Sequence, residues 1–111
     1  MIELTIKEYL EENLDVPVYL EVPEKAPPIF VVFEKTGSGK ENYLKSSTFA
    51  FQSYGPSLYE AAKLNERVKQ AVESLISTPE FARVQLNSDY NFTDTETRQY
   101  RYQAVYDFKH Y

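Results

Sequence analysis

The chain has 111 residues, 42% hydrophobic and 15% aromatic, with a net charge of −5 at pH 7, and these values fit a single globular domain over residues 1–111. It contains no cysteine, which excludes disulfides, thiolate metal sites and cysteine nucleophiles, and its negative charge disfavours broad binding of polyanions. No apolar stretch approaches the ~18 residues of a membrane span and no signal-peptide pattern opens the sequence, so we expect folding in the cytoplasm and no membrane partner.

The first helix is predicted over about residues 5–14. Thr5 and Glu8 have the spacing of a capping box, in which two side chains satisfy backbone N–H groups at the start of a helix. The apolar side chains behind this start recur at helical spacing and form one narrow stripe. The stripe consists of Ile6, Tyr9, Leu10 and Leu14.

Acidic side chains concentrate at the start of the chain. The first 24 residues hold seven acids and one base, whereas the remaining residues hold ten acids and eleven bases. Metal binding or acid–base catalysis would need these carboxylates to be buried or joined by further ligands, whereas a run of charge on a helix usually faces solvent. We therefore predict a solvated acidic face. Its candidate residues are Glu8, Glu11, Glu12 and Asp15.

Two β-type runs follow the first helix. Residues 18–22 are bounded by prolines, which favours an edge strand or an extended arm. Residues 29–34 are mostly β-branched and aromatic and are predicted as a strand. Their apolar character is continuous, which indicates a central strand covered on both faces or covered by a protein partner.

A hairpin is predicted from residues 29–34 to residues 44–54, where the apolar and polar side chains alternate. The polar segment between the two strands, residues 35–43, contains two glycines and is predicted as a flexible loop. Strand, glycine-rich loop and strand together indicate antiparallel pairing with a long tip.

The principal helix is predicted over residues 57–77, and the rest of the chain is expected to form the surface on which it packs. Ser57 and Glu60 fit a capping box, and Pro79 ends the helix because proline disfavours helical geometry in the residue before it. The predicted apolar stripe consists of Leu58, Ala61, Val68, Val72, Leu75 and Ile76, with Ala62 at one edge and Leu64 and Ala71 on the flank.

Two more strands are predicted after this helix, over residues 81–86 and 98–111, with a turn-rich loop over residues 87–97. The last strand has the clearest period of two, which is typical of an antiparallel sheet with one buried and one polar face. We therefore predict an α+β fold, in which a mostly antiparallel sheet of four or five strands is flanked by two helices in the order α-β-β-β-α-β-β. The face predicted to be buried carries Tyr100, Tyr102, Ala104, Tyr106 and Phe108.

No segment carries a complete catalytic or cofactor motif. The glycine-rich segment 36–40 invites comparison with a phosphate-binding loop, but Glu34 stands where the first glycine belongs and Glu41 where a hydroxyl residue must follow the lysine. His110 is the only histidine, and nothing around it suggests a metal cluster or a Ser/His/Asp set. We therefore expect no enzyme activity, no cofactor and no metal site.

The aromatic strand 98–111 offers an alternative of another class, a single-stranded nucleic-acid-binding module that stacks bases on tyrosines. Aromatic residues at a period of two usually form a core face. Burial of these tyrosines beneath the helices is therefore the favoured interpretation.

The two polar loops are candidate interaction elements, because long loops held by a rigid sheet often bind partners; the alternative is a mobile hairpin tip. The candidate interface residues are Lys35, Thr36, Gly37, Ser38, Gly39, Lys40 and Tyr43 in the first loop, and Asn87, Asp89, Tyr90, Asn91 and Phe92 in the second.

Four stretches that span nearly the whole chain carry a resemblance to a known family. They are IKEYLEENL, DVPVYLEVPEKAPPIFVVFEKTG, FAFQSYGPSLYEAAKLNERVKQA and VQLNSDYNFTDTETRQYRYQAVYDFKHY. Together they resemble the tail terminator, or tail-completion, family of long-tailed bacteriophages and prophages. The most specific pieces are QSYGPSLYEAAKLNERV, NSDYNFTDTETRQYRYQAVYDF and the closing His110-Tyr111.

The resemblance implies a small α+β subunit that forms a homo-hexameric ring at the head-proximal end of the virion tail, assembled in the cytoplasm of the bacterial host and able to stay monomeric until it meets the tube. The ring would stop polymerisation of the tail tube protein and offer a surface to the head-completion protein, while DNA passes through its lumen without sequence reading. The two loops and the acidic face would contact neighbours or line the lumen, where negative charge would repel phosphates. A neck or head–tail joining protein is the alternative within the same context.

Overall fold

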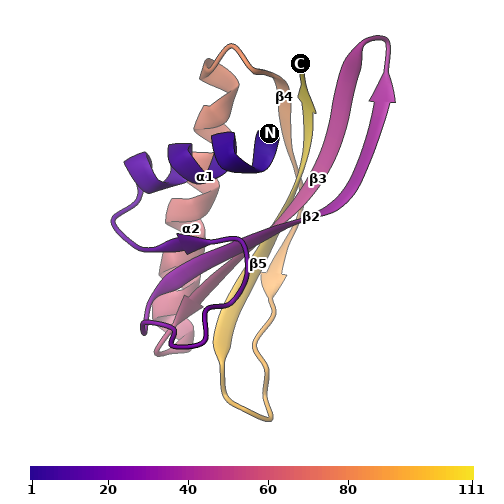
Figure 1. The fold of residues 1–111 in the computed structure, drawn as a ribbon. Helices are drawn as coiled ribbons and strands as arrows, with labels where there is room; N and C mark the ends of the chain where they lie inside the picture. The colour runs from indigo at the N-terminus through magenta and orange to yellow at the C-terminus, as the bar shows by residue number, and fades with distance from the viewer.

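A five-stranded sheet with both helices on one of its faces forms the molecule (Figure 1). The structure is a computed structural model that describes all residues 1–111. The strands lie in the order β1-β2-β3-β5-β4; β1 and β2 are parallel and the other neighbouring pairs are antiparallel. The predicted α+β class, the mostly antiparallel sheet and the element order are therefore confirmed. The elements are α1 (Ile2–Asn13), β1 (Val18–Tyr19), β2 (Phe30–Glu41), β3 (Leu44–Gly55), α2 (Leu58–Glu73), the 3-10 helix η1 (Ser74–Ser77), β4 (Phe81–Asn91) and β5 (Tyr100–His110).

Helix α2 begins as predicted. The side chain of Ser57 accepts a hydrogen bond from the backbone N–H of Glu60 at 3.1 Å, which satisfies one of the free donors at the start of the helix. The α-helical part ends at Glu73, and η1 continues the chain as far as Ser77. The predicted span of this helix is therefore confirmed, with a tighter last turn.

The buried side of α2 differs from the predicted stripe. Leu58 and Ile76 are 41% and 51% exposed, whereas Leu64 and Ala71 are buried. Helix α1 packs beside α2 on the same face of the sheet, so the flank of α2 becomes interior. Ile76 lies in η1, where about three residues complete a turn, and the tighter period rotates its side chain off the stripe.

Helix α1 starts before the position that the sequence predicts, because the expected capping box does not form. Thr5 lies inside the helix, where its backbone N–H and its hydroxyl both donate to the carbonyl of Met1, at 3.3 and 3.4 Å. The apolar stripe was predicted correctly. Ile6 and Leu10 are fully buried, and Leu14 is nearly so.

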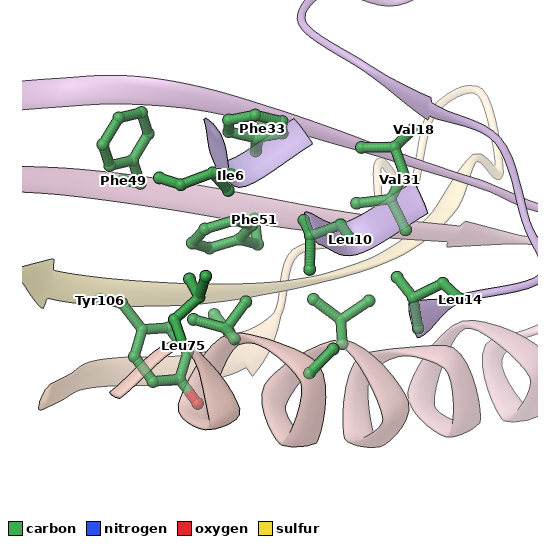
Figure 2. Packing of buried hydrophobic residues seen from close by; sticks show 14 of the residues in the cluster. Ile6, Leu10, Leu14, Val18, Val31, Phe33, Phe49, Phe51, Leu75 and Tyr106 are labelled. Carbon is green, nitrogen blue, oxygen red and sulfur yellow. The ribbon is translucent and has the colours of Figure 1, made fainter. Parts of the chain in front are cut away.

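One cluster of 17 buried residues fills the space between the sheet and the helices (Figure 2). Its centre is aromatic, with Phe33, Phe49, Phe51, Tyr106 and Phe108 contributed by three neighbouring strands. The rings of Phe33 and Phe51 stack at 5.4 Å between centroids, and Phe49 meets Phe108 edge-on at 5.8 Å. Such pairs contribute about 0.5–1.5 kcal/mol each beyond the burial of their area.

Strand β2 is buried on both faces over its first four residues, Phe30 to Phe33, as its continuous apolar run predicts. Val31 and Phe33 face the helices and belong to the main cluster. Phe30 and Val32 lie on the opposite face in a smaller cluster with Tyr54, whose ring stacks on that of Phe30 at 4.3 Å. The face of the sheet without helices therefore carries a small apolar cluster at the end where β2 begins and β3 ends.

The prediction of a flexible loop over residues 35–43 was wrong. Strand β2 runs through this segment to Glu41 and pairs with β3, so that only Asn42 and Tyr43 form the turn. Both have positive φ, 50° and 70°, which is the combination that a two-residue hairpin turn of type I′ requires. The pairing with β3, rather than the side-chain pattern, makes this segment a strand.

The outer part of the β2–β3 hairpin projects past the helices, and residues 36–47 are called the hairpin arm here (Figure 1). Apart from the partly covered Gly37, all residues of β2 beyond Phe33 are exposed. Strand β3, on the inner side of the arm, remains joined to β5 as far as the pair Lys45–His110. The outer strand of the arm therefore has a free edge.

The prediction of a turn-rich loop over residues 87–97 was wrong in its first part. Strand β4 extends to Asn91 and remains paired with β5 over this length. The turn occupies residues 92–99, where an isolated bridge joins Asp94 and Gln99. Register shifts interrupt the β4–β5 ladder at two places and bend this edge strand.

Strand β5 follows the predicted alternation in its second half. Ala104, Tyr106 and Phe108 are at most 2% exposed on the face that the helices cover. The intervening Val105 and Asp107 are only partly buried. The favoured interpretation, in which the tyrosine face packs beneath the helices, is thus confirmed for the centre of the strand.

Candidate interaction surfaces

The acidic side chains of α1 lie on its exposed side. Glu8, Glu11 and Glu12 are all exposed, as expected for a solvated face. Lys7 pairs with Glu11, with 3.1 Å between Nζ and Oε2. Glu8 and Glu12 form no ion pair within the chain.

Asp15 belongs to a different contact from the helical acids. It follows α1 and forms an ion pair with Arg67 of α2. The hydrogen bond from the Arg67 guanidinium, together with its charge, lowers the pKa of Asp15 below its ordinary value. Asp15 therefore ties the end of α1 to α2 and is not a free member of the acidic face.

A groove of about 590 Å³ separates the hairpin arm from the start of α1, and three lysines lie along it. Lys35 at the base of the arm pairs with Glu3 at 3.5 Å. Lys40 and Lys45 lie directly opposite each other in the β2–β3 ladder. Neither of these two lysines forms an ion pair, so the arm carries two uncompensated positive charges side by side.

His110 lies at the inner end of the same groove, where its side chain is 4% exposed. Its Nε2 atom is 2.8 Å from Oγ of Ser47 on β3. Burial lowers the pKa of His110, and the positive charges of Lys45 and Lys35 act in the same direction. His110 is therefore neutral at pH 7, and its hydrogen bond joins β3 to β5.

Asp89 is a structural residue that joins β4 to α2. Its two carboxylate oxygens accept hydrogen bonds from Asn65 at 2.7 Å and from Lys69 at 2.5 Å. The hydrogen bond that Lys69 donates to Asp89 is the largest cause that raises the pKa of Lys69. Because both carboxylate oxygens have partners inside the chain, Asp89 is a poor candidate for contact with another molecule.

The face of the sheet without helices carries a chain of neutral hydrogen bonds. Gln52 donates to Gln103 at 2.8 Å, and Gln103 donates to the hydroxyl of Tyr90 at 2.5 Å. The hydroxyl of Tyr54 donates to Gln52 at 3.1 Å. These side chains supply hydrogen-bond partners to one another across the strands. The polar face of the sheet can therefore be ordered without helices packed on it.

A second polar contact on that face fixes the start of the segment that was expected to be a loop. Asp107 accepts hydrogen bonds from Thr48 at 2.7 Å and from Asn87 at 2.9 Å. Just past the end of β4, the Arg101 guanidinium lies 4.5 Å from the centroid of the Phe92 ring. The side chains of the second predicted interface are thus tied mainly to this chain itself.

The sequence predicted only part of the edges of the sheet. The predicted edge strand over residues 18–22 is present, but only Val18 and Tyr19 pair with β2. The longer free edges belong to β4 and to β2 beyond Val32, because these strands have no outer neighbour. Free edges offer backbone donors and acceptors to another chain.

The predicted interface residues therefore do not form one surface. Those in residues 35–43 lie on the hairpin arm and its base, whereas those in residues 87–92 lie on edge strand β4 and just past it. Among their aromatic members, the most exposed is Tyr43 at the arm tip, which is 93% exposed. The one sequence signal that could have located the turn of the arm is Asn42, a residue that tolerates positive φ.

The stacking platform proposed for nucleic acid is not accessible at its centre. Tyr106 is fully buried, and its hydroxyl donates to Glu73 of α2 at 2.5 Å. A base cannot stack on this ring while α2 is in place. No group of three or more histidine, aspartate or glutamate side chains is arranged to hold a metal ion, and neither helix has the length and apolar composition to span a bilayer.

Comparison with known proteins assigns no family to the chain. No protein-family model matches the sequence, and no curated protein matches it.

Proposed function

We propose that this chain is a structural subunit of a bacteriophage tail, and that a ring of its copies caps the tail tube at the head-proximal end. The ring would stop polymerisation of the tube protein and present a surface to the head-completion protein. The resemblance of the sequence to tail terminators, over nearly its whole length, supports this proposal. The role is steric and needs no catalytic group.

The structural observation that carries the proposal is the hairpin arm. Its outer strand is exposed on both faces and has a free edge, and it ends in the exposed Tyr43. An ordered element that buries so little of itself suits a surface that a neighbouring subunit completes. By contrast, three side chains that could take part in acid–base chemistry form hydrogen bonds within the chain: His110, Asp89 and Tyr106.

The ring model requires two different contact patches on each subunit, because head-to-tail association generates closed rings. The hairpin arm, with its unpaired lysines, and the exposed acids of α1 are chemically distinct patches of opposite charge. A ring assembled in the host cytoplasm would join the virion when the tube reaches its final length. DNA would then pass through the lumen during packaging or ejection without being read.

Electron microscopy of particles from a phage deleted for this chain tests the proposal. Overlong tails without heads are the expected result, and a plasmid copy of the wild-type chain should restore normal length. Tails of normal length beside finished heads would instead assign the chain to head–tail joining. Unaltered infectious particles would remove it from virion assembly.

A further inference from the structure

We propose that neighbouring copies join head to tail through two matched pairs of like charges. Lys40 and Lys45 on the hairpin arm of one copy would contact Glu8 and Glu12 on α1 of the next. This inference rests on the proposed function, since it describes how the copies of the ring meet. It commits the arm to a second copy of this chain rather than to the tube protein.

The arm carries an uncompensated charge pair. Lys40 and Lys45 lie directly opposite each other across the hairpin, and like charges at opposed positions destabilise a strand pair. Two nearby acids, Glu41 in the ladder and Glu3 of α1 in the same groove, pair with other lysines: Glu41 with Lys109 at 3.7 Å and Glu3 with Lys35 at 3.5 Å. The isolated chain thus retains a repulsion that an acidic partner would remove.

Helix α1 carries the complementary pair. Glu8 and Glu12 are four residues apart, which places them on one face of the helix, where like charges repel. Both are exposed, and the one nearby lysine, Lys7, pairs with Glu11 instead. The last turn of α1 contains no basic residue, so Glu12 also lies near the negative end of the helix dipole without compensation.

The two pairs match in spacing. Side chains four apart on a helix have Cβ atoms roughly 5–6 Å apart, and directly opposed residues in a strand pair have Cβ atoms roughly 4.5–5.5 Å apart. Two lysines and two glutamates with such similar separations can form two ion pairs at once. Each repulsive pair would then become part of an attractive contact.

The placement of the two pairs favours contact between copies over contact within one chain. Helix α1 begins beside the hairpin arm and runs away from it, toward the opposite side of the molecule (Figure 1). Glu8 and Glu12 lie on its solvent side, facing away from the core that Ile6 and Leu10 enter. Different patches on different sides of a subunit give a heterologous contact, which closes into a ring when the rotation is suitable.

Charge reversal and charge exchange test this docking in the deleted phage supplied with plasmid copies. Lys40→Glu with Lys45→Glu, and separately Glu8→Lys with Glu12→Lys, should each lower the infectious titre by about tenfold or more, because each change places like charges against each other at every joint of the ring. The chain with all four changes keeps the wild-type net charge, and its arm glutamates would pair with the lysines on α1 of the next copy. It should restore the titre.

Lys63→Glu with Arg98→Glu is the matched control, because both residues are exposed and form no ion pair, and it should leave the titre unchanged. A wild-type titre from both reversed pairs would overturn the docking, and so would a fourfold variant as defective as its parents. In either case the wild-type plasmid would still restore tail length, so the proposed function would stand. Failure of the proposed function is recognised separately, by normal tails in the deletion itself.

Discussion

The hydroxyl of Tyr106 donates a 2.5 Å hydrogen bond to the carboxylate of Glu73, and this bond joins the centre of β5 to the end of α2. The ring of Tyr106 is fully buried, whereas Glu73 is exposed, so the bond bridges the core and the surface. Burial of the phenol is the main cause that raises the pKa of Tyr106 far above its ordinary value, with Glu73 acting in the same direction. Tyr106 therefore serves to pack the core, and the hydrogen bond of its hydroxyl fixes the orientation of its ring.

Replacing Tyr106 by Phe should lower the free energy of unfolding by about 1 kcal/mol, because the ring stays buried while one hydrogen bond is lost and Glu73 returns to water. Denaturant unfolding measures the difference. Tyr111→Phe is the control, since that ring is 73% exposed, and it should be neutral. An unchanged midpoint for the Tyr106 variant would show that the bond contributes nothing.

The chain should lose stability as the pH falls below about 6.5, the ordinary pKa of histidine. Burial lowers the pKa of His110 in the folded state, so below pH 6.5 the unfolded chain binds a proton that the folded chain does not. This part of the stability is complete above that pH and is lost as the pH falls through the lowered value. The free energy of unfolding should differ less between pH 7.5 and pH 5.5 in the His110→Gln variant than in the wild type. Equal differences would exclude His110 as the cause.

Leu10→Ala should destabilise the chain by about 2–5 kcal/mol, because Leu10 is fully buried between α1 and the sheet and its removal leaves a cavity. Leu4→Ala on the same helix is the control, since Leu4 is 48% exposed, and it should change stability by less than about 0.5 kcal/mol. Similar effects of the two changes in denaturant unfolding would contradict the docking of α1 through this face.

Gly55 should reject a side chain that Gly37 accepts. A Cβ at Gly55 would lie 2.7 Å from the backbone nitrogen of Ala61, where β3 passes the first turn of α2, whereas a Cβ at Gly37 would meet only Thr48, at 3.8 Å. Gly55→Ala should therefore cost about 1–3 kcal/mol through forced backbone movement. Gly37→Ala should be nearly neutral, and thermal unfolding of both variants checks the contrast. Comparable losses would refute it.

Lys45→Glu should affect the isolated chain and the particle in opposite directions. It places an acid opposite Lys40, which should stabilise the hairpin by about 0.2–1 kcal/mol, while it removes one of the contacts proposed between copies. Thermal unfolding of the purified chain and the infectious titre measure the two effects. A variant that is less stable in isolation would point to a different role for the lysine pair.

The sequence predicted the elements whose side chains carry a periodic pattern. The α2 start was correct because Ser57 and Glu60 determine it locally. The strand 44–54 was correct because its second half alternates, with Phe49 and Phe51 on one face. The direction of burial around α2 could not be predicted in full. It depends on α1 packing beside α2, which buries Leu64 and Ala71.

The two incorrect loop predictions have one physical cause. Residues 36–41 and 87–91 contain glycine, serine, asparagine and aspartate, which locally favour turns, yet both segments are strands because β3 and β5 supply their partners. In β4 the contact of Asp89 with α2 adds to this pairing. Strand pairing thus overrides the local preference of these residues for turns. The candidate interface residues therefore lie on the hairpin arm and on edge strand β4 rather than on two loops.

A cryo-electron-microscopy reconstruction of the head-proximal end of the tail, from a phage that encodes this chain, is the most direct test of the central claim. The claim predicts a closed ring of copies of this fold on the last tube ring, with the hairpin arm of each copy against α1 of its neighbour. A tail end that contains no copy of this fold would contradict it.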